Sequence, residues 1–451
     1  MESTVSSTSF ALAPRFAMLS CLLIQLAVCP AQDAPYDAAP VAEAPYYRVR
    51  LDADASAGGL RYPVQYTVWV PPRVDRLRGV VVHQHGCGPG SCQSGLTGAY
   101  DLHWQALAAA HDCALLAAVY EQPDKTGCAA WCDPRNGSDA AFQAGLKRLA
   151  DRSGHPELAE VPWALWGHSG GAYWSGAMTL LHPDRVVAAW LRSGVPTIER
   201  DETREIDPFL ITAAARSVPI ACNLGTREGV TDRSNKFATV WPGVQAFAEA
   251  MRADRDAPGV IAVSVDPNTS HECGDQRYLA IPWFDACLTQ RLDGDGKLRP
   301  VEADAWVPVP AAAEGVETTV DFGRVPTAEL AAAWSNYVNG RGVTDRTPPP
   351  PAANVRWDDG TLRFDAVADR ESGLRAVRIE SGGQTVATVP TRPSNRFGRP
   401  LFQGLQYSDT PANPLQEMSA TLPADLSRLP LRLRTVNTAG QVSIPVDVPQ
   451  P

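Results

Sequence analysis

The sequence lacks an excess of positive charge. Its 40 lysine and arginine residues are outnumbered by 50 aspartate and glutamate residues, which gives the 451-residue chain a formal net charge of −10. Nucleic acids and anionic membrane surfaces are bound mainly through basic clusters, so neither is expected as a partner. Hydrophobic residues make up 44% and charged residues 20% of the chain. These proportions are typical of globular proteins, and the length predicts two or three domains.

Long apolar runs are also missing, apart from one near the beginning of the chain. The stretch "FAMLSCLLIQLAVCPA" ends at residue 31. Its apolar part is shorter than the about 20 residues needed to cross a bilayer, and small residues follow it, as in a secretory signal peptide. We therefore expect residues 1–31 to be a signal peptide, the protein to be secreted or periplasmic, and no stable membrane insertion. A lipid anchor at Cys29 is disfavoured because bulky Val28 precedes it.

No pair of cysteines has the C-x-x-C spacing with a second pair downstream that is typical of structural zinc sites. Neither a metal nor another cofactor is expected. Of the ten cysteines, Cys21 and Cys29 belong to the signal peptide, and the even number that remains favours disulfide bonds in an exported chain. The sequence does not show which cysteines pair.

Continuous apolar runs alternate with helical patterns between residues 46 and 292. Runs such as "CALLAAVY", "VPWALWG" and "GVIAVSVDP" are typical of strands that are buried on both faces. Their alternation with helices predicts an α/β fold with a mostly parallel sheet covered on both faces. The first two strand-like segments look antiparallel and fit the edge of a mixed sheet. We expect this domain to span residues 32–340, with a poorly patterned extension at 293–340.

The pattern changes beyond residue 340. Residues 341–352 are rich in proline and predict an extended linker. Residues 353–451 contain two hairpin patterns with glycine turns, "LRAVRIESGGQTVATVP" and "LRLRTVNTAGQVSIPV". Short alternating strands of this kind predict a small β-sandwich. The segment resembles a fibronectin type III domain, which suggests contact with a polysaccharide or another polymer.

One serine stands between glycines in "ALWGHSGGAYW", residues 164–174. The G-x-S-x-G pattern around Ser169 follows a buried-strand pattern and precedes a helical one, which is the context of a nucleophile elbow. The turn is so tight that side chains at the flanking positions would collide with neighbouring backbone, which explains the glycines. The sequence predicts Ser169 as a nucleophile at the start of a helix.

With this elbow, residues 46–292 resemble the α/β-hydrolase superfamily, whose chain order is nucleophile, acid, histidine. Only one histidine, His271, lies after residue 182, so the resemblance leaves His271 as the base. The acid should follow the strand "VPIACNLG". Glu228 and Asp232 both qualify, and Glu228 is favoured because the family's acid usually lies a few residues past the strand. His168 is expected to be framework or pocket lining.

The resemblance also implies two backbone donors for an oxyanion. One is the N–H of Gly170; the other comes from "HQHGCGPGSC", from Cys87 or alternatively Gly88. The "HGC" triplet resembles the oxyanion loop of secreted polyhydroxyalkanoate depolymerases and of feruloyl or acetyl-xylan esterases, although "GHSGGAYW" departs from the depolymerase pattern. Trp131 and Tyr173 are candidate pocket residues, although simple packing under its loop fits Trp131 equally well.

These features predict a secreted serine hydrolase that cleaves a small-molecule or polymeric carboxylic ester through a Ser-His-Glu triad and an acyl-enzyme. A serine peptidase of the same fold and a polyester depolymerase remain alternatives. A non-catalytic binding protein is disfavoured because every required position is filled.

Overall fold

The computed structural model describes residues 40–124, 127–200, 206–254, 259–267, 269–313, 316, 323–343, 345–391, 409–411 and 417–451. The expected signal peptide lies outside the described residues. Among the described helices, none is long and apolar enough to cross a membrane.

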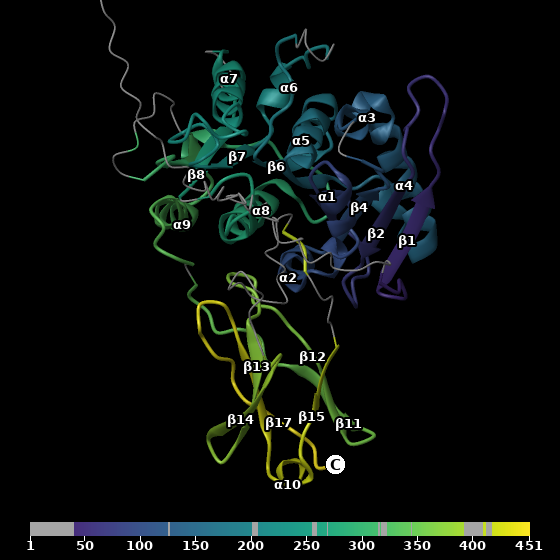
Figure 1. Ribbon diagram of the computed structural model, residues 1–451, viewed down its shortest axis with the longest axis vertical. Coiled ribbons are helices and arrows are strands. Elements are labelled where there is room, and N and C mark those ends of the chain that lie inside the picture. The colour runs from purple at the N-terminus through teal and green to yellow at the C-terminus, as the bar shows by residue number, and fades with distance from the viewer. Residues whose placement is uncertain are drawn as a thin grey trace, which may run out of the picture. The chain divides into compact units, whose positions relative to one another are not determined.

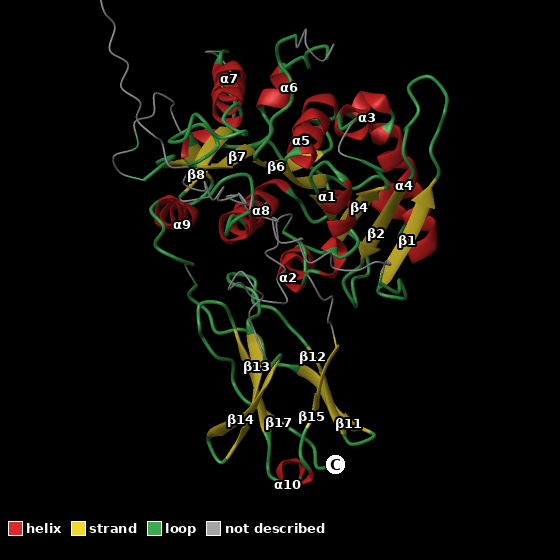
Figure 2. Ribbon diagram, in the orientation of Figure 1, coloured by secondary structure: helices red, strands yellow, loops and turns green. Residues whose placement is uncertain are grey.

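Eight strands form one large sheet in the order β1-β2-β4-β3-β5-β6-β7-β8 (Figures 1 and 2). The edge strand β1 is antiparallel to β2, β2 is antiparallel to β4, and β3 to β8 are parallel to one another. The predicted mostly parallel sheet with an antiparallel edge is therefore confirmed. The strand bounds are β1 Tyr46–Leu51, β2 Val64–Trp69, β3 Gly79–Gln84, β4 Cys113–Tyr120, β5 Trp163–His168, β6 Val186–Arg192, β7 Ile220–Gly225 and β8 Ile261–Asp266.

Helices cover both faces of this sheet (Figure 1). Successive residues of β3 show why its sequence is apolar throughout: Val80 and Val82 pack into one core cluster, and Val81 packs into the other. The first cluster includes α4, α5 and α7, and the second includes α2, α8 and α9. The helices are α1 Pro89–Ser94, α2 Leu102–Ala110, α3 Ala129–Cys132, α4 Ser138–Ser153, α5 Gly170–Leu181, α6 Ala213–Arg216, α7 Val240–Arg252, α8 Arg277–Arg291 and α9 Ala328–Val338. We refer to residues 46–338 as the α/β unit.

Short strands replace helices after residue 352, and we call residues 353–451 the β-module. They form one antiparallel sheet in the order β11-β12-β15 and another in the order β14-β13-β16-β17. Phe364, Ile379 and Leu433 belong to the core cluster of this module. The bounds are β11 Ala353–Asp358, β12 Thr361–Asp365, β13 Ala376–Ser381, β14 Gln384–Val389, β15 Glu417–Thr421, α10 Ala424–Ser427, β16 Arg432–Val436 and β17 Val446–Asp447. In the extension, β9 Val307–Pro308 pairs with β10 Arg324–Val325.

Candidate active site

Ser169 lies in a tight turn between the end of β5 and the start of α5. Its backbone has φ 55° and ψ −118°, an unfavourable conformation for a residue with a side chain, and such conformations cluster at functional sites. A Cβ atom on Gly167 would lie 2.1 Å from the carbonyl oxygen of Gly171, and one on Gly171 would lie 2.2 Å from that of His85. These contacts explain both glycines of the motif.

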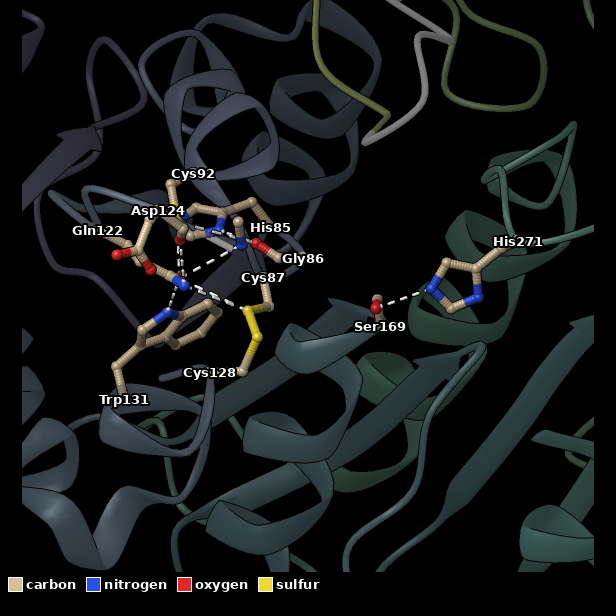
Figure 3. The surroundings of a disulfide bond; sticks show 11 residues. His85, Gly86, Cys87, Cys92, Gln122, Asp124, Cys128, Trp131, Ser169 and His271 are labelled. Carbon is tan, nitrogen blue, oxygen red and sulfur yellow. Dashed lines mark hydrogen bonds between the residues drawn. A yellow bond between two sulfur atoms is a disulfide. The ribbon is translucent and has the colours of Figure 1, made fainter. Parts of the chain in front are cut away.

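Three side chains from separate loops form one line of hydrogen bonds. Ser169 Oγ lies 2.8 Å from His271 Nε2, a pair drawn in Figure 3, and His271 Nδ1 lies 2.6 Å from Glu228 Oε1. Glu228 is fully buried. The other candidate acid, Asp232, is partly exposed, and its Oδ1 accepts hydrogen bonds from Ser234. The structure thus brings Glu228 and not Asp232 to His271.

The second carboxylate oxygen of Glu228 is also held. Oε2 accepts a hydrogen bond from Ser193 Oγ and another from the backbone N–H of Gly225, both at 2.7 Å. Because both oxygens have donors, the carboxylate is fixed in the orientation that faces the imidazole. Ser193 itself has a positive φ of 59° at the end of β6.

The loop that carries His271 is held by two buried side chains. Arg192, the last residue of β6, donates from Nη2 to the carbonyl of Ser270 at 3.0 Å and to that of Glu272. His168 lies 2.6 Å through Nε2 from the carbonyl oxygen of His271. Burial lowers the pKa of His168 well below its usual value, so the ring is neutral and its Nε2–H is the donor. Three consecutive carbonyls are therefore held in place.

One face of the His271 ring is covered by an aromatic side chain. Phe237 stacks on the imidazole with ring centroids 3.8 Å apart and an interplanar angle of 9°. This contact comes from the loop between β7 and α7. It restricts rotation of the imidazole and shields that face from water.

The backbone of Cys87 lies close to that of Gly170, the residue that follows Ser169. The nitrogen of Cys87 lies 3.2 Å from the position that a Cβ atom of Gly170 would occupy. Within the described part of the chain, neither the Cys87 nor the Gly170 N–H has a hydrogen-bond acceptor. The alternative donor, Gly88, already donates its N–H to Gln122 Oε1 at 3.2 Å. Cys87 and Gly170 are thus the N–H groups left available for a ligand oxygen.

A disulfide links Cys87 to Cys128 and ties this loop to the segment before α3 (Figure 3). The prediction of disulfide bonding is confirmed for this pair. The six remaining cysteines beyond residue 31 are buried thiols. Burial raises the thiol pKa of Cys92, for example, to about 12, which makes the thiolate scarce at neutral pH.

Gln122 lies beside the same loop and forms hydrogen bonds with it (Figure 3). Its Oε1 also accepts from Trp131 Nε1 at 2.8 Å, and its Nε2 donates to the carbonyl of Asp124. Trp131 is fully buried and stacks on Tyr120 with centroids 4.4 Å apart. The expectation that Trp131 lines the substrate pocket is therefore wrong: its ring packs in the core and its N–H is used in the Gln122 network.

A cavity of about 820 Å³ opens beside Ser169. Tyr173 lines it together with apolar side chains from the segment after β6 and from α7. Among the described residues, its lining contains the carboxylates Asp133 and Glu199 and includes neither lysine nor arginine. The lining residues are Cys87, Gly127, Cys128, Ala129, Cys132, Asp133, Ser169, Gly170, Tyr173, Gly194, Val195, Pro196, Thr197, Ile198, Glu199, Ile206, Thr239, Val240, Gly243 and Ala246.

Away from this cavity, Asp345, Asp369 and Glu371 place one carboxylate oxygen each within 4.8 Å of one another. These oxygens already accept hydrogen bonds from Asn437 and from the N–H of Thr347, among others. The cluster is explained by bonds within the protein, and we assign it no metal.

No family model matches the chain, and no curated protein matches it. Solved structures to which the chain is similar include a thermostable esterase (14% identity, 50% of this chain and 55% of that chain, TM-score 0.33). A cold-adapted esterase from an Arctic intertidal metagenomic library (15%, 56% and 96%, 0.34) and a siderophore hydrolase from Aspergillus nidulans (14%, 56% and 94%, 0.33) are also similar. Identities and scores this low do not identify the function.

The sequence did not predict the four side chains that hold the site residues in place, which are Arg192, Ser193, Phe237 and Gln122. The one local signal is Arg192, a charged residue at the end of the otherwise apolar strand "VVAAWLR". A charge in such a position needs a buried partner, but the sequence does not show which one.

Proposed function

We propose that this protein is a serine hydrolase that cleaves carboxylic esters through an acyl-enzyme. The observation that carries the proposal is the continuous line of hydrogen bonds from Glu228 through His271 to Ser169 at the edge of a cavity. An activated serine requires a base within hydrogen-bond reach and a third group that orients the base.

In the first half of the proposed reaction, Ser169 Oγ attacks the carbonyl carbon of the ester while His271 Nε2 takes its proton. Glu228 accepts a hydrogen bond from Nδ1–H and stabilises the imidazolium that forms. The oxyanion of the tetrahedral intermediate accepts hydrogen bonds from the N–H groups of Cys87 and Gly170. When the intermediate collapses, His271 gives its proton to the departing alcohol.

In the second half, water attacks the acyl-enzyme carbonyl and gives a proton to His271. The same two N–H groups stabilise the second oxyanion. Collapse of this intermediate breaks the bond to Ser169 Oγ, which recovers its proton from His271, and the carboxylic acid leaves. No redox partner or cofactor is needed to balance these steps.

The α/β-hydrolase fold is part of the proposal. Its supports are the elbow between β5 and α5, an available N–H after β3 and the chain order Ser169, Glu228, His271. For the β-module we propose a fibronectin type III-like sandwich with an accessory role toward a polymer, because its strands divide into antiparallel sheets of three and four.

The cavity supports a neutral ester with an apolar acyl or alcohol group. Val195, Pro196, Ile198 and Val240 form an apolar wall, and apolar surface of this kind stabilises an apolar group by about 25 cal/mol per Å² buried. The described lining residues include neither lysine nor arginine, and the carboxylate of Asp133 is paired with Arg135 at 2.7 Å, so these residues offer no cation to bind an anionic substrate.

The test is hydrolysis by purified protein of a p-nitrophenyl ester series from acetate to octanoate, against aminoacyl p-nitroanilides of matched size. We expect ester cleavage to exceed amide cleavage and Ser169→Ala to abolish both the activity and the covalent labelling by a fluorophosphonate. Cleavage of the amides alone would favour a peptidase. Labelling that survives Ser169→Ala would exclude the proposed nucleophile.

Export is also proposed, since disulfides persist mainly in oxidising compartments. Amino-terminal sequencing of the protein recovered outside the cytoplasm is expected to begin near residue 32. Recovery of the intact chain in the cytoplasm would contradict this.

A further inference from the structure

Arg277, the first residue of α8, is an arginine with no exposed surface. Its guanidinium forms two hydrogen bonds with Asp101, Nη1 to Oδ1 at 3.1 Å and Nη2 to Oδ2 at 2.7 Å. Asp101 also caps α2 by accepting from the N–H groups of His103 and Trp104. A buried cation with this geometry ties two helices of the α/β unit together.

The same guanidinium has a second carboxylate partner, which belongs to the β-module. Asp409, between β14 and β15, accepts from Arg277 Nε at 2.8 Å and is fully buried. Its Oδ2 accepts from Trp104 Nε1 at 3.2 Å and from Gln276 Nε2 at 3.4 Å, and lies 3.6 Å from His83 Nε2. All of these partners belong to the α/β unit.

Further bonds join neighbouring segments of the two parts. Thr97 Oγ1 donates to the carbonyl of Pro411 at 2.8 Å, and His103 Nε2 lies 2.9 Å from the carbonyl oxygen of Arg370. Arg370 also pairs with Asp285 of α8 at 3.2 Å. The contact is therefore not limited to one side chain.

Several residues of the buried cluster around Asp409 lie on the same segments of the chain as the candidate site residues. His83 precedes Cys87 on β3 and stacks on Trp166, with centroids 3.9 Å apart. Trp166 precedes Ser169 on β5 and donates its Nε1–H to Gln276 Oε1 at 3.0 Å. This cluster therefore contacts three segments: the strand before Cys87, the strand before Ser169 and the turn that follows His271.

We propose that Asp409 docks the β-module onto the α/β unit and acts as a positioning residue for the active site. The proline-rich linker predicts a tethered and independent module, but a carboxylate of that module completes a buried ion-pair cluster of the α/β unit. Breaking a buried pair by removing one partner is strongly destabilising, because the other charge stays buried without its full set of partners. The kinetic part of this inference rests on the proposed function; the docking part does not.

The test uses the full chain with Asp409→Asn, which keeps the shape but removes the charge, and Asp409→Ala. The matched control is Asp447→Asn in the same module, because Asp447 pairs with Arg432 at the surface with 81% of its side chain exposed. Amide hydrogen exchange is measured in peptides covering residues 97–110, 272–284 and 376–389.

For the docking part, we expect Asp409→Asn to speed exchange at least about tenfold in the first two peptides, which belong to the α/β unit, and to leave residues 376–389 unchanged. The melting temperature should fall by at least about 5 °C. The control should change neither quantity. Thr97→Val removes a docking bond from the other side of the contact and should give the same pattern more weakly, even if Asp409→Ala fails to fold. Unchanged exchange in the α/β peptides of Asp409→Asn would overturn the docking proposal.

For the positioning part, kcat on a p-nitrophenyl ester should fall at least about tenfold in Asp409→Asn while KM changes less than about twofold, since small displacements of reacting groups cost rate more than binding. An unchanged kcat together with altered exchange would overturn the positioning role and leave the docking. If the wild-type chain hydrolyses no ester, the proposed function fails, and the exchange data still decide the docking.

Discussion

His168 holds the backbone carbonyl of His271 at 2.6 Å, so the residue beside the candidate nucleophile fixes the loop of the candidate base. Arg192 holds the carbonyls on either side of the same residue. The segments that carry Ser169 and His271 are thereby joined through backbone contacts in addition to the bond between these two side chains. A rigid loop of this kind keeps the imidazole at one distance from the serine oxygen.

This arrangement predicts that Arg192→Lys is a poor catalyst that still folds. An ammonium group cannot span the carbonyls of Ser270 and Glu272 as the planar guanidinium does. We expect kcat to fall by about 10- to 100-fold with KM nearly unchanged. The matched control is Arg291→Lys: Arg291 is also buried and also donates to backbone carbonyls, but to those of Val186 and Val187 at the start of β6 rather than to those that flank His271. An equal kcat in the two variants would show that Arg192 does not position His271.

The acid can be assigned by paired amide substitutions. Glu228→Gln should lower kcat by about 10³- to 10⁴-fold, because the amide cannot stabilise the imidazolium and the histidine tautomer is no longer fixed. Asp232→Asn should remain near wild-type activity, since Asp232 bonds with Ser234 rather than with His271. Steady-state kinetics on one ester at saturating concentration decides the matter. The reverse pattern would make Asp232 the acid.

Much of this site could be predicted from local patterns. The elbow at Ser169 has a motif set between a buried strand and a helix, and His271 follows from the lack of another histidine after residue 182. The sequence favours Glu228 over Asp232 as the acid but does not exclude Asp232, because the path of the loop after β7 decides which carboxylate reaches the imidazole.

The remaining features depend on contacts between distant segments. Asp409 meets Arg277 across 132 residues, and neither neighbourhood carries a motif. Cys87 and Cys128 pair because the loops after β3 and β4 meet, which cysteine spacing does not encode. Trp131 was misassigned because an aromatic residue between two cysteines fits a pocket wall and a core equally well; the stacking on Tyr120 decides.

The disulfide should support the oxyanion loop. We expect Cys128→Ser, which frees Cys87 from its cross-link, to lower kcat about tenfold, less than the about 10²- to 10³-fold loss caused by removing an oxyanion donor outright. Thiol reduction of the wild type should lower kcat to the same level. The variant should show no further response to the thiol, which separates this effect from reduction elsewhere. Full activity in Cys128→Ser would show that the loop holds its position without the cross-link.

Buried neutral histidines should make stability depend on pH in the acidic range. His85 lies with Nδ1 2.7 Å from the carbonyl oxygen of Gly86, and burial lowers its pKa from 6.5 to about 4. Between these two values the unfolded chain binds a proton that the folded chain does not, so the free energy of unfolding falls as the pH falls from 6.5 towards 4. The loss amounts to about 1.4 kcal/mol per pH unit for this histidine once the pH is well below 6.5, or about 3 kcal/mol in total. Burial of His103, whose pKa is lowered to about 3, acts in the same direction.

Urea unfolding of full-length His85→Asn at several pH values tests this. We expect the variant to have a lower free energy of unfolding at pH 8, because bonds to the ring are lost, but the dependence of that free energy on pH between 6 and 4.5 should be shallower by about one proton. His85→Asn combined with His103→Asn should be shallower by about two. The slope is the decisive quantity, because it counts bound protons and is independent of the packing lost in either variant. A slope equal to that of the wild type would mean that His85 already carries its proton in the folded state, and the hydrogen bond to Gly86 would then have to be retained by an imidazolium.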